Sequence, residues 1–555
     1  MSTWILRRPA LPALGSWRHW RPELSSEALV ASTALFFTIA CNGLFWGSAL
    51  AVHPGSLRLG VALFFLLTGL HGLLLGLLVW RWNARVLLTV LVPLALVAAH
   101  YMGRYHIYLD VDMLRNVLAT DHKESAELLT PSLLWPLACS IPPVWMLWRV
   151  RLRRHGVVRT LLRRVVFVVV ALLTTVGGGL LASQDVSSIL RGHREIRYLA
   201  TPANIIIGLP RALRGDSPVR HAPKLPIGTD AHATPRAAGS RPRLLVIVVG
   251  ETVRAANWGL NGYARQTTPE LATTSVVNFP DMQSCGTATE VSLPCMFSPW
   301  GRHDYDEARI RGHQSLLHVL EHAGIATLWR DNQSGCKGVC EGLAIEHLDS
   351  ASDPALCANG RCMDEILLAD LPARVHALKP VGTRDRVIVL HQLGNHGPSY
   401  FERYPAAFRR FTPTCDTAEL GDCSREQIVN SYDNAVLYTD HMLARTIDTL
   451  GRMDDYDTAM IYLSDHGESL GEKGLFLHGV PRAIAPEQQT RVPMAMWFSS
   501  GFTADRKLDM SCLRERANRP ADHDVLFSSV LGLMQVHTSL YDRQRDVFAG
   551  CTPAA

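Results

Sequence analysis

Cysteine is scarce in the first half of this 555-residue chain, where Cys41 and Cys139 stand alone before residue 280. Later cysteines include four close pairs, which are Cys285 with Cys295, Cys336 with Cys340, Cys357 with Cys362, and Cys415 with Cys423. This density argues against a reducing compartment for the second half and predicts disulfides between near neighbours in an oxidising one. Structural zinc held by the second and third pairs is a less favoured alternative. Cys512 and Cys551 remain as a further candidate pair.

Long hydrophobic runs fill the first third of the chain, at about 29–50, 58–80, 86–101, 132–148 and 165–182. A helix needs about 20 apolar residues to cross a bilayer, and most of these runs are near that length. Prolines interrupt or shorten the third and fourth runs. Buried helices of a soluble protein are the alternative, but five such runs in succession argue against it. The sequence therefore predicts an α-helical membrane domain of five transmembrane helices at 1–185.

Acidic residues are missing from the arginine-rich segment 149–164, between the fourth and fifth runs. Further arginines precede the first run and lie between the second and third, whereas the alternate loops 51–57 and 102–131 are not basic in balance. Basic loops stay in the cytoplasm, so the N-terminus is expected inside and everything after about 183 outside. The net charge of +5 is largely this cytoplasmic arginine, and we expect no nucleic-acid partner.

A small-residue cleavage site is also lacking after the first run, so we expect no cleavable signal peptide. Segment 186–243 is expected to contain an interfacial helix with Arg191, Arg194, Glu195 and Arg197, whose cations can meet lipid phosphates, followed by a surface linker rich in Pro, Gly, Ala and His. From 244 to 555, apolar runs alternate with helical patterns, without an internal repeat. That alternation predicts an α/β domain around a mostly parallel sheet.

Two strand-like runs in this domain end on potential metal ligands. Ile461–Leu463 reads as a buried strand that leads to Asp465 and His466, and 244–249 is an apolar run that leads to Glu251. In open α/β sheets, ligands gather beyond the carboxyl ends of strands, and carboxylate oxygen with imidazole nitrogen suits a zinc-like cation. An isolated Asp-His is more often a cap or a turn, but the two strand ends together favour one metal site.

Hydroxyls and further histidines follow other elements. The segment Ser284–Cys295 offers Ser and Thr hydroxyls in a small-residue turn, and such a hydroxyl can ionise near neutral pH when it binds a divalent metal. An ordinary helix cap is the alternative for this segment. His391 and His396 follow a strand-like run, and His478 lies twelve residues beyond His466. Imidazoles there could bind a second metal, hold a phosphate, or be structural.

Together these motifs resemble the phosphoethanolamine transferases, which include the lipid A enzymes and the mobile colistin-resistance enzymes. The resemblance rests on 250–252, 285–289, 395–398, 464–472 and 477–479, and it covers nearly the whole chain. It implies an alkaline-phosphatase-like, sulfatase-like catalytic domain from 244 to 555, with zinc held by Glu251, Thr289, Asp465 and His466. A second zinc ion is an open alternative. Thr289 is then the nucleophile, and His396 and His478 lie beside the transferred phosphate as catalytic residues.

The resemblance also implies residues that bind the donor headgroup. These are Asn116, Thr120, Glu124, Ser334 and Lys337, together with His396 and His478. The spacing of the first three predicts that they share one helical face, and without the family they would read as a solvated polar face. Val525 and Ser528 stand where relatives commonly carry Asn and His, which weakens any expectation about the acceptor.

The expected activity is transfer of phosphoethanolamine from phosphatidylethanolamine to lipid A through a phospho-threonine, which lowers surface charge and gives resistance to polymyxin. We expect a monomer in the bacterial inner membrane with its catalytic domain in the periplasm. Core heptose, Kdo and periplasmic glucan are alternative acceptors. A glycerol-phosphate transferase like lipoteichoic acid synthase is disfavoured by the cysteine pairs. A sulfatase would need a Cys-x-Pro-x-Arg motif, which is missing, and a membrane receptor on a dead phosphatase fold would have lost its ligands.

Overall fold

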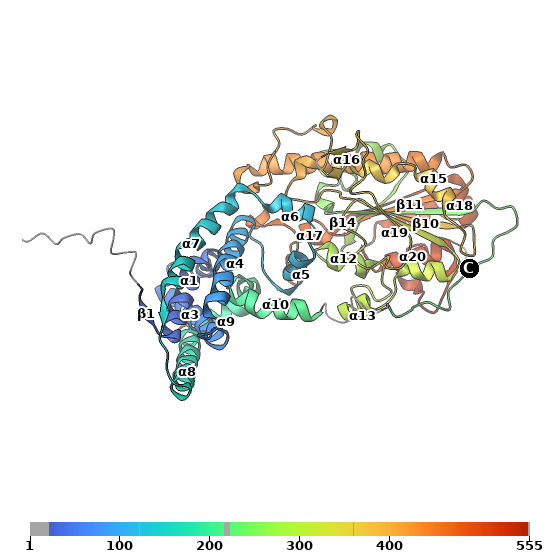
Figure 1. The fold of residues 1–555 in the computed structure, drawn as a ribbon. Helices are drawn as coiled ribbons and strands as arrows, with labels where there is room; N and C mark the ends of the chain where they lie inside the picture. The colour runs from blue at the N-terminus through green and yellow to red at the C-terminus, as the bar shows by residue number, and fades with distance from the viewer. Residues whose placement is uncertain (1–20, 121, 216–222, 359, 553–555) are drawn as a thin grey trace, which may run out of the picture. The chain divides into compact units, whose positions relative to one another are not determined.

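The computed structural model describes residues 21–120, 122–215, 223–358 and 360–552. The chain divides into two compact units, Met1–Gly103 with Pro131–Ile207, and Arg104–Thr130 with Gly208–Ala555. The second unit therefore takes in the segment 104–130, which lies between two of the hydrophobic runs in sequence. Each unit is coherent by itself, and Figure 1 gives the order of their elements.

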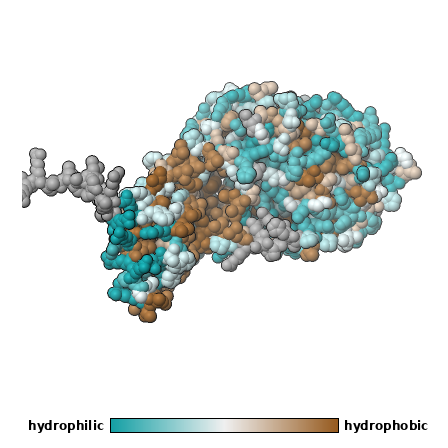
Figure 2. Space-filling view, viewed as in Figure 1, coloured by the Kyte–Doolittle hydropathy of each residue, from teal (hydrophilic) through white to brown (hydrophobic). Residues whose placement is uncertain are grey.

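The first unit is helical. Its helices are α1 (Ser26–Ala40), α2 (Gly43–Ala51), α3 (Leu57–Leu78), α4 (Ala84–Tyr105), α7 (Leu134–Arg149), α8 (Val157–Leu181) and α9 (Ser183–Gly192), and a short pair of strands joins β1 (Glu23–Leu24) to β2 (Arg151–Leu152). Helices α3 and α8 approach closely because glycines line the contact: a Cβ on Gly178 would lie 2.4 Å from the backbone nitrogen of Leu66. Figure 2 shows hydrophobic side chains gathered on the surface of these helices, as expected where lipid replaces water.

Three helices among the described residues, α3, α4 and α8, are long and apolar enough to cross a membrane, and α1 with α2 makes a fourth if the bent pair is one span. The pair bends by 61° beside Asn42, whose side-chain amide donates to the carbonyls of Phe37 and Thr201. Helix α7 has 16 residues, or about 24 Å at 1.5 Å per residue, less than the roughly 30 Å of a bilayer core. Three or four of the five expected crossings are therefore supported among the described residues, and a crossing by α7 stays a prediction.

The second unit is built on an eight-stranded sheet with the order β15-β5-β14-β11-β4-β10-β6-β7. Its strands are β4 (Arg243–Gly250), β5 (Val277–Gln283), β6 (Ala326–Asp331), β7 (Ile345–His347), β10 (Arg386–His391), β11 (Asp457–Ser464), β14 (Arg491–Phe498) and β15 (Ala521–Asp522). Strands β11, β4, β10, β6 and β7 are parallel, whereas β14 is antiparallel to both neighbours. The central strands are buried on both faces, which explains their continuous apolar sequences.

Helices cover both faces of this sheet, with α15 and α16 on one side and α12, α19 and α20 on the other (Figure 1). The helices of the unit are α5 (Val111–Ala119), α6 (His122–Leu128), α11 (Pro269–Ala272), α12 (Thr289–Met296), α13 (Glu307–Gly312), α14 (Leu316–His322), α15 (Leu371–Ala377), α16 (Arg425–Gly451), α17 (Glu487–Thr490), α18 (Ser500–Arg506), α19 (Met510–Ala517) and α20 (Val525–Met534), and α10 (Ala203–Gly215) runs across the division between the units. This is the predicted α/β arrangement.

Part of the expected linker packs on the second unit. Leu225 makes an isolated parallel bridge to His313, and β3 (His232–Ala233) pairs with β16 (Val536–His537). Ile227 and Ala231 are buried in the main hydrophobic core of the unit. Residues from 225 to 233 therefore contribute to the fold of the second unit, although their Pro- and Gly-rich sequence lacks hydrophobic periodicity.

Five disulfides join the ten later cysteines. The four predicted near-neighbour bonds are formed, and they join Cys285 to Cys295, Cys336 to Cys340, Cys357 to Cys362, and Cys415 to Cys423. Cys512 bonds to Cys551, which completes the further candidate pair.

The bond between Cys336 and Cys340 lies in the loop after β6, and both residues are buried in the main core of the unit. Because Cys340 and Cys362 are each bonded to a near neighbour, neither pair has a free thiol for a metal. The alternative of structural zinc held by these two pairs is therefore wrong for the structure described.

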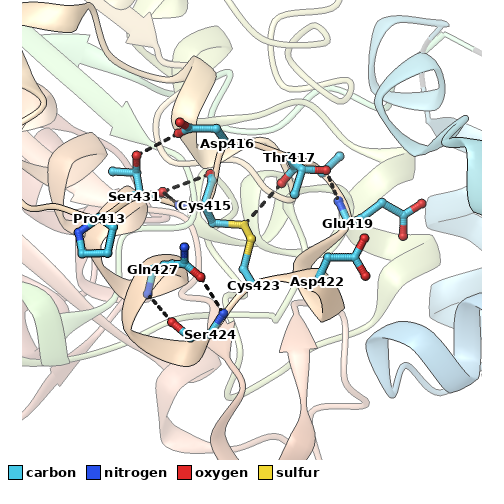
Figure 3. The surroundings of a disulfide bond; sticks show 12 residues. Pro413, Cys415, Asp416, Thr417, Glu419, Asp422, Cys423, Ser424, Gln427 and Ser431 are labelled. Atoms are coloured by element: carbon cyan, nitrogen blue, oxygen red, sulfur yellow. Dashed lines mark hydrogen bonds between the residues drawn. A yellow bond between two sulfur atoms is a disulfide. The ribbon is translucent and has the colours of Figure 1, made fainter.

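Short-range pairing also orders the loops around the disulfides. Figure 3 shows Cys415–Cys423 at the start of α16, where Ser424 and Gln427 cap the helix reciprocally. Two more short hairpins of the unit pair β8 (Cys357–Ala358) with β9 (Arg361–Cys362), and β12 (Ser469–Leu470) with β13 (Phe476–Leu477).

Candidate active site

The metal-ligand candidates gather because β4 and β11 are parallel neighbours whose ends are in register. Gly250 lies opposite Ser464 in the ladder, so Glu251 and the Asp465–His466 pair leave the sheet side by side. All three side chains are buried. The carboxylate of Asp465 is oriented by backbone amides, since its Oδ1 atom accepts from the nitrogens of Thr252 and His466.

Thr289 completes the group from the first residue of α12. Its Oγ1 atom lies 2.9 Å from Glu251 Oε2 and 3.3 Å from His466 Nε2. His466 Nε2 in turn lies 3.3 Å from Glu251 Oε1 and 3.2 Å from Asp465 Oδ2. The structure thus brings the four predicted zinc ligands together within one buried cluster.

The donor chemistry of this cluster fits a cation. His466 Nδ1 lies 3.0 Å from the carbonyl oxygen of Gly467, which can only accept, so the neutral ring carries its proton on Nδ1 and aims a lone pair from Nε2 at the two carboxylates. Burial lowers the pKa of His466 to about 3, which keeps the ring neutral. Glu251 Oε1 and Asp465 Oδ2 are buried and have no hydrogen-bond donor among the described residues. Three electron-rich atoms that face one another repel, and a cation between them would stabilise all three.

Without a bound cation, both carboxyl groups of this cluster have raised pKa values. Burial raises the pKa of Glu251 well above its ordinary value, and the charge of Asp465 raises it further. Burial also raises the pKa of Asp465. A bound metal ion would reverse both effects, because its charge stabilises the carboxylates.

Other potential metal groups in the described part of the chain are less suited. One contains Cys285 and Cys295, which are bonded to each other. Another joins His303, Asp522 and Asp524 on the surface, where Asp524 already accepts the backbone N–H groups of residues 302 and 303. Neither includes His396 or His478, so the second zinc ion stays a prediction.

His396 and His478 form a pair with opposite protonation preferences. Their ring centres are 5.3 Å apart, and the His478 ring lies 4.5 Å from that of His466. Burial lowers the pKa of His396 well below its ordinary value, and the charge of His478 lowers it further. Burial also opposes a charge on His478, but the Glu468 carboxylate, 3.0 Å from Nδ1, outweighs it and raises the pKa. The pair offers one proton donor and one neutral imidazole.

The segment 104–130 brings donor-loop residues to the same site. Glu124 Oε1 lies 3.9 Å from His396 Nε2 and accepts from the Gln333 side chain at 3.3 Å. Asn116 lies beside the residue after His478, since a Cβ on Gly479 would be 3.5 Å from its Nδ2 atom. Glu124 therefore faces His396, and Asn116 lies next to Gly479.

The expectation that Asn116, Thr120 and Glu124 share one helical face is wrong. Helix α5 ends at Ala119, and Thr120 lies between α5 and α6. The Thr120 hydroxyl donates to the Asn116 carbonyl at 2.7 Å. A local bond from side chain to backbone thus ends the helix instead of presenting the hydroxyl with the other two groups.

Ser334 and Lys337 lie in the loop after β6. Lys337 Nζ donates to Ser334 Oγ at 2.6 Å, and the Ser334 hydroxyl donates to the Gln333 side-chain oxygen. The amide nitrogen of Gln333 also lies 3.3 Å from Glu251 Oε2, so this side chain links the metal group to Glu124. Our sequence reasoning missed Gln333, although its place beside Ser334 after a strand end was a usable signal. It also gave no role to Glu468, which sets the charge of His478.

Comparison with known proteins supports the assignment suggested by these motifs. Residues 67–216 match the model of the family "Phosphoethanolamine transferase EptA/EptB", and residues 243–536 match the sulfatase family model. Phosphoethanolamine transferase EptA of Escherichia coli (strain K12) is 36% identical over 540 residues, which cover 96% of this chain and 98% of the relative. The chain belongs to the phosphoethanolamine transferase family.

Solved structures of family members agree in fold. The integral membrane protein lipooligosaccharide phosphoethanolamine transferase A from Neisseria meningitidis superposes with a TM-score of 0.91 at 37% identity, over 96% of this chain and 100% of that one. The C-terminal periplasmic domain of phosphoethanolamine transferase EptC from Campylobacter jejuni matches with a TM-score of 0.52 at 40% identity, over 60% of this chain and 100% of that one. The phosphoethanolamine transferases thus share both the helical region and the sulfatase-like domain of this chain.

Proposed function

We propose that this protein transfers phosphoethanolamine from phosphatidylethanolamine to lipid A through a phosphorylated Thr289. The observation that carries the proposal is the Thr289 hydroxyl, held within 3.3 Å of both Glu251 and His466 in a buried cluster of metal-ligand type. Relatives named as phosphoethanolamine transferases over almost the whole chain support the transferred group. A membrane-bound donor and acceptor also fit a chain with several apolar helices.

The site fits zinc, which Glu251, Asp465, His466 and Thr289 would hold. Mixed imidazole and carboxylate ligands are typical of that ion. When bound, the ion would lower the pKa of a coordinated hydroxyl and neutralise charge on a phosphoryl group. We propose one such ion in the resting enzyme.

The first half-reaction breaks the donor phosphodiester. The Thr289 oxygen forms a bond to phosphorus, and its proton passes to Glu251 Oε2, 2.9 Å away. The bond from phosphorus to the diacylglycerol oxygen breaks, and protonated His478 gives that oxygen its proton, with His396 as the neighbouring neutral imidazole. Diacylglycerol leaves, and phosphoethanolamine remains on Thr289.

The second half-reaction reverses the roles. A phosphate oxygen of lipid A, already anionic, forms the new bond to phosphorus as the bond from phosphorus to the Thr289 oxygen breaks. That oxygen recovers its proton from Glu251, and His478 regains its proton from water. Covalent catalysis replaces one difficult transfer by two easier ones. The product carries an ammonium group beside a phosphate that had roughly −1.5 to −2 charges near neutral pH, so cationic peptides such as polymyxin should bind the modified surface less well.

We propose further that the protein is a monomer of the bacterial inner membrane, with five crossings if α7 spans the bilayer together with its neighbours. The organisation would be a membrane domain at 1–185, an interfacial helix and linker at 186–243, and a periplasmic catalytic domain from 244. The name of the Campylobacter jejuni relative, a periplasmic domain, supports this location. Core heptose, Kdo and periplasmic glucan stay as alternative acceptors.

Mass spectrometry of lipid A from cells that express the chain tests the function. We expect lipid A with an added phosphoethanolamine group in cells with the wild-type protein and unmodified lipid A with Thr289→Ala. Unmodified lipid A in both, with modified core or glucan in the wild type only, would reassign the acceptor. No modified envelope component at all would favour a receptor on a phosphatase-like fold.

A further inference from the structure

Helix α6 carries two carboxylates three residues apart, which places them on one helical face. Glu124 faces His396 and Gln333, as described above. Glu127 instead meets two arginines: its Oε1 atom lies 2.8 Å from Arg361 Nε, and its Oε2 atom accepts from Arg403 Nη2. Neighbouring acids on one short helix thus have different surroundings.

The two arginines are fixed and largely withdrawn from water. The Arg403 side chain is fully buried, and its Nε atom donates to the His396 carbonyl at 2.7 Å. Arg361 lies in the β8–β9 hairpin, which the Cys357–Cys362 disulfide closes, and its side chain is 18% exposed. The Arg403 guanidinium is therefore held beside His396 independently of Glu127, and the backbone that carries Arg361 is closed by a disulfide.

Charge balance makes Glu127 important for its neighbour. Two guanidiniums face one Glu127 carboxylate, which leaves one net positive charge. Without that carboxylate, two positive charges would face the same helix, whose other acid, Glu124, lies one helical turn away. A partly buried cation attracts an anion strongly, because water screens it poorly.

We propose that Glu127 is a positioning residue for donor recognition: it occupies Arg361 and Arg403 so that the Glu124 carboxylate stays directed toward the ammonium group of the donor. This inference rests on the proposed function and on the role that the family resemblance implies for Glu124, which is to bind the donor headgroup. Glu127 itself touches neither the metal group nor the nucleophile. Its effect should therefore appear in the donor KM and not in the chemical step.

The test uses the full-length protein in lipid vesicles, with headgroup transfer measured as the mole fraction of phosphatidylethanolamine is varied and bound zinc measured in parallel. Glu127→Gln should raise the apparent donor KM about tenfold, with kcat within about twofold and zinc unchanged. Glu127→Gln combined with Arg361→Gln leaves Arg403 as the one charge of the cluster, which restores the net positive charge of one found in the wild type. The donor KM of this double variant should therefore return to within about threefold of wild type.

Lys123→Met is the matched control. Lys123 lies on α6 like Glu127, and it pairs with Asp349 at 2.6 Å, outside the arginine cluster. Its removal should leave the donor KM within about twofold of wild type, as for a partly exposed ion pair. An equal rise in KM for Lys123→Met would show that Glu127 only docks the helix.

A double variant with a donor KM as high as that of Glu127→Gln, or higher, would also overturn the proposal. That result would show that the ion pairs of Glu127 only fix α6 in place, since removal of Arg361 cannot restore a lost ion pair. If Glu127→Gln does not fold, the double variant and Arg361→Gln still decide, since balanced charge predicts near-normal donor KM for both. Failure of the proposed function looks different: the wild type itself would then transfer no phosphoethanolamine, or Glu124→Gln would leave the donor KM unchanged.

Discussion

The hydroxyl oxygen of Thr289 lies 2.9 Å from a carboxylate oxygen of Glu251, 38 residues earlier in the chain. The two residues come from the first turn of α12 and from the end of β4. Their contact places a nucleophile candidate directly against a buried base. Thr287, two residues before Thr289, faces elsewhere and donates to the Val480 carbonyl at 2.8 Å.

The nucleophile assignment predicts a sharp difference between these two threonines. Thr289→Ala should keep its disulfides and its fold but lose transfer activity by at least about 1,000-fold, because no covalent intermediate can form. Thr287→Val should lose about 1 kcal/mol of stability with its buried hydrogen bond and keep transfer within about tenfold. Lipid-headgroup transfer and thermal melting measure the two effects. An inactive Thr287 variant beside an active Thr289 variant would reverse the assignment.

The raised pKa of His478 predicts a pH effect with a definite sign. A proton donor works in its protonated form, so the rate should be lost as pH rises through the pKa of His478, which lies above the ordinary 6.5. Glu468→Gln removes the charge that outweighs burial, so the pKa should fall and the alkaline limb of the rate profile should move to lower pH by about one unit. The exposed Glu487 supplies the control variant Glu487→Gln, whose profile should be that of wild type.

Metal removal should destabilise the catalytic unit, because the buried carboxylates and the His466 lone pair would then face one another without a cation. A ligand at 100 times its Kd stabilises a fold by about 2.7 kcal/mol, so chelation should lower the Tm by roughly 5–10 °C. Asp465→Asn should abolish most of that chelator effect. An unchanged wild-type Tm, with metal absent from the untreated protein by elemental analysis, would argue against a resident ion.

Strand-end reasoning predicted which side chains of the site lie together, because its logic is local. Apolar, β-branched runs specify β4 and β11, and the polar residue after each strand must leave the sheet at the same edge when the strands are parallel. The neighbour relation itself was an assumption that the structure supports. The antiparallel β14 was not predicted, because strand direction depends on connections that alternation alone does not reveal.

The remaining features depend on contacts between distant residues. The bend beside Asn42 is held by Thr201, 159 residues away, and no local signal marks it. The Gln333 link to Glu124 crosses 209 residues, and Arg403 meets Glu127 across 276. The helix end at Thr120 has a different explanation. The bond from its hydroxyl to the Asn116 carbonyl is local, but the same bond also occurs inside helices, so the sequence did not reveal that the helix ends there.

The arginine asymmetry and the five disulfides predict the side of the membrane on which the catalytic unit works. A reporter fused after the last residue should be active only if it functions outside the inner membrane, because basic loops keep the N-terminus inside. Alkaline phosphatase and a cytoplasmic fluorescent protein are matched fusions that report opposite locations. Fluorescence of the second with an inactive first would overturn the topology and the oxidising compartment with it.

The last prediction separates donor binding from metal binding. Glu124 lies near His396 but is not among the atoms that surround the metal group, so Glu124→Ala should retain zinc and lose most transfer from phosphatidylethanolamine. A fragment that begins near residue 223 should also bind zinc, since its sheet, disulfides and metal group are complete, and a comparable domain of a relative has been solved alone. That fragment lacks α5 and α6, and with them Asn116 and Glu124, so its transfer from vesicles should be poor.

The assay is headgroup transfer with metal content measured on the same samples, and Lys123→Met in the full chain is the control for altered docking of α6. Full activity of Glu124→Ala, or of the fragment on vesicles, would show that the segment 104–130 takes no part in recognising the donor.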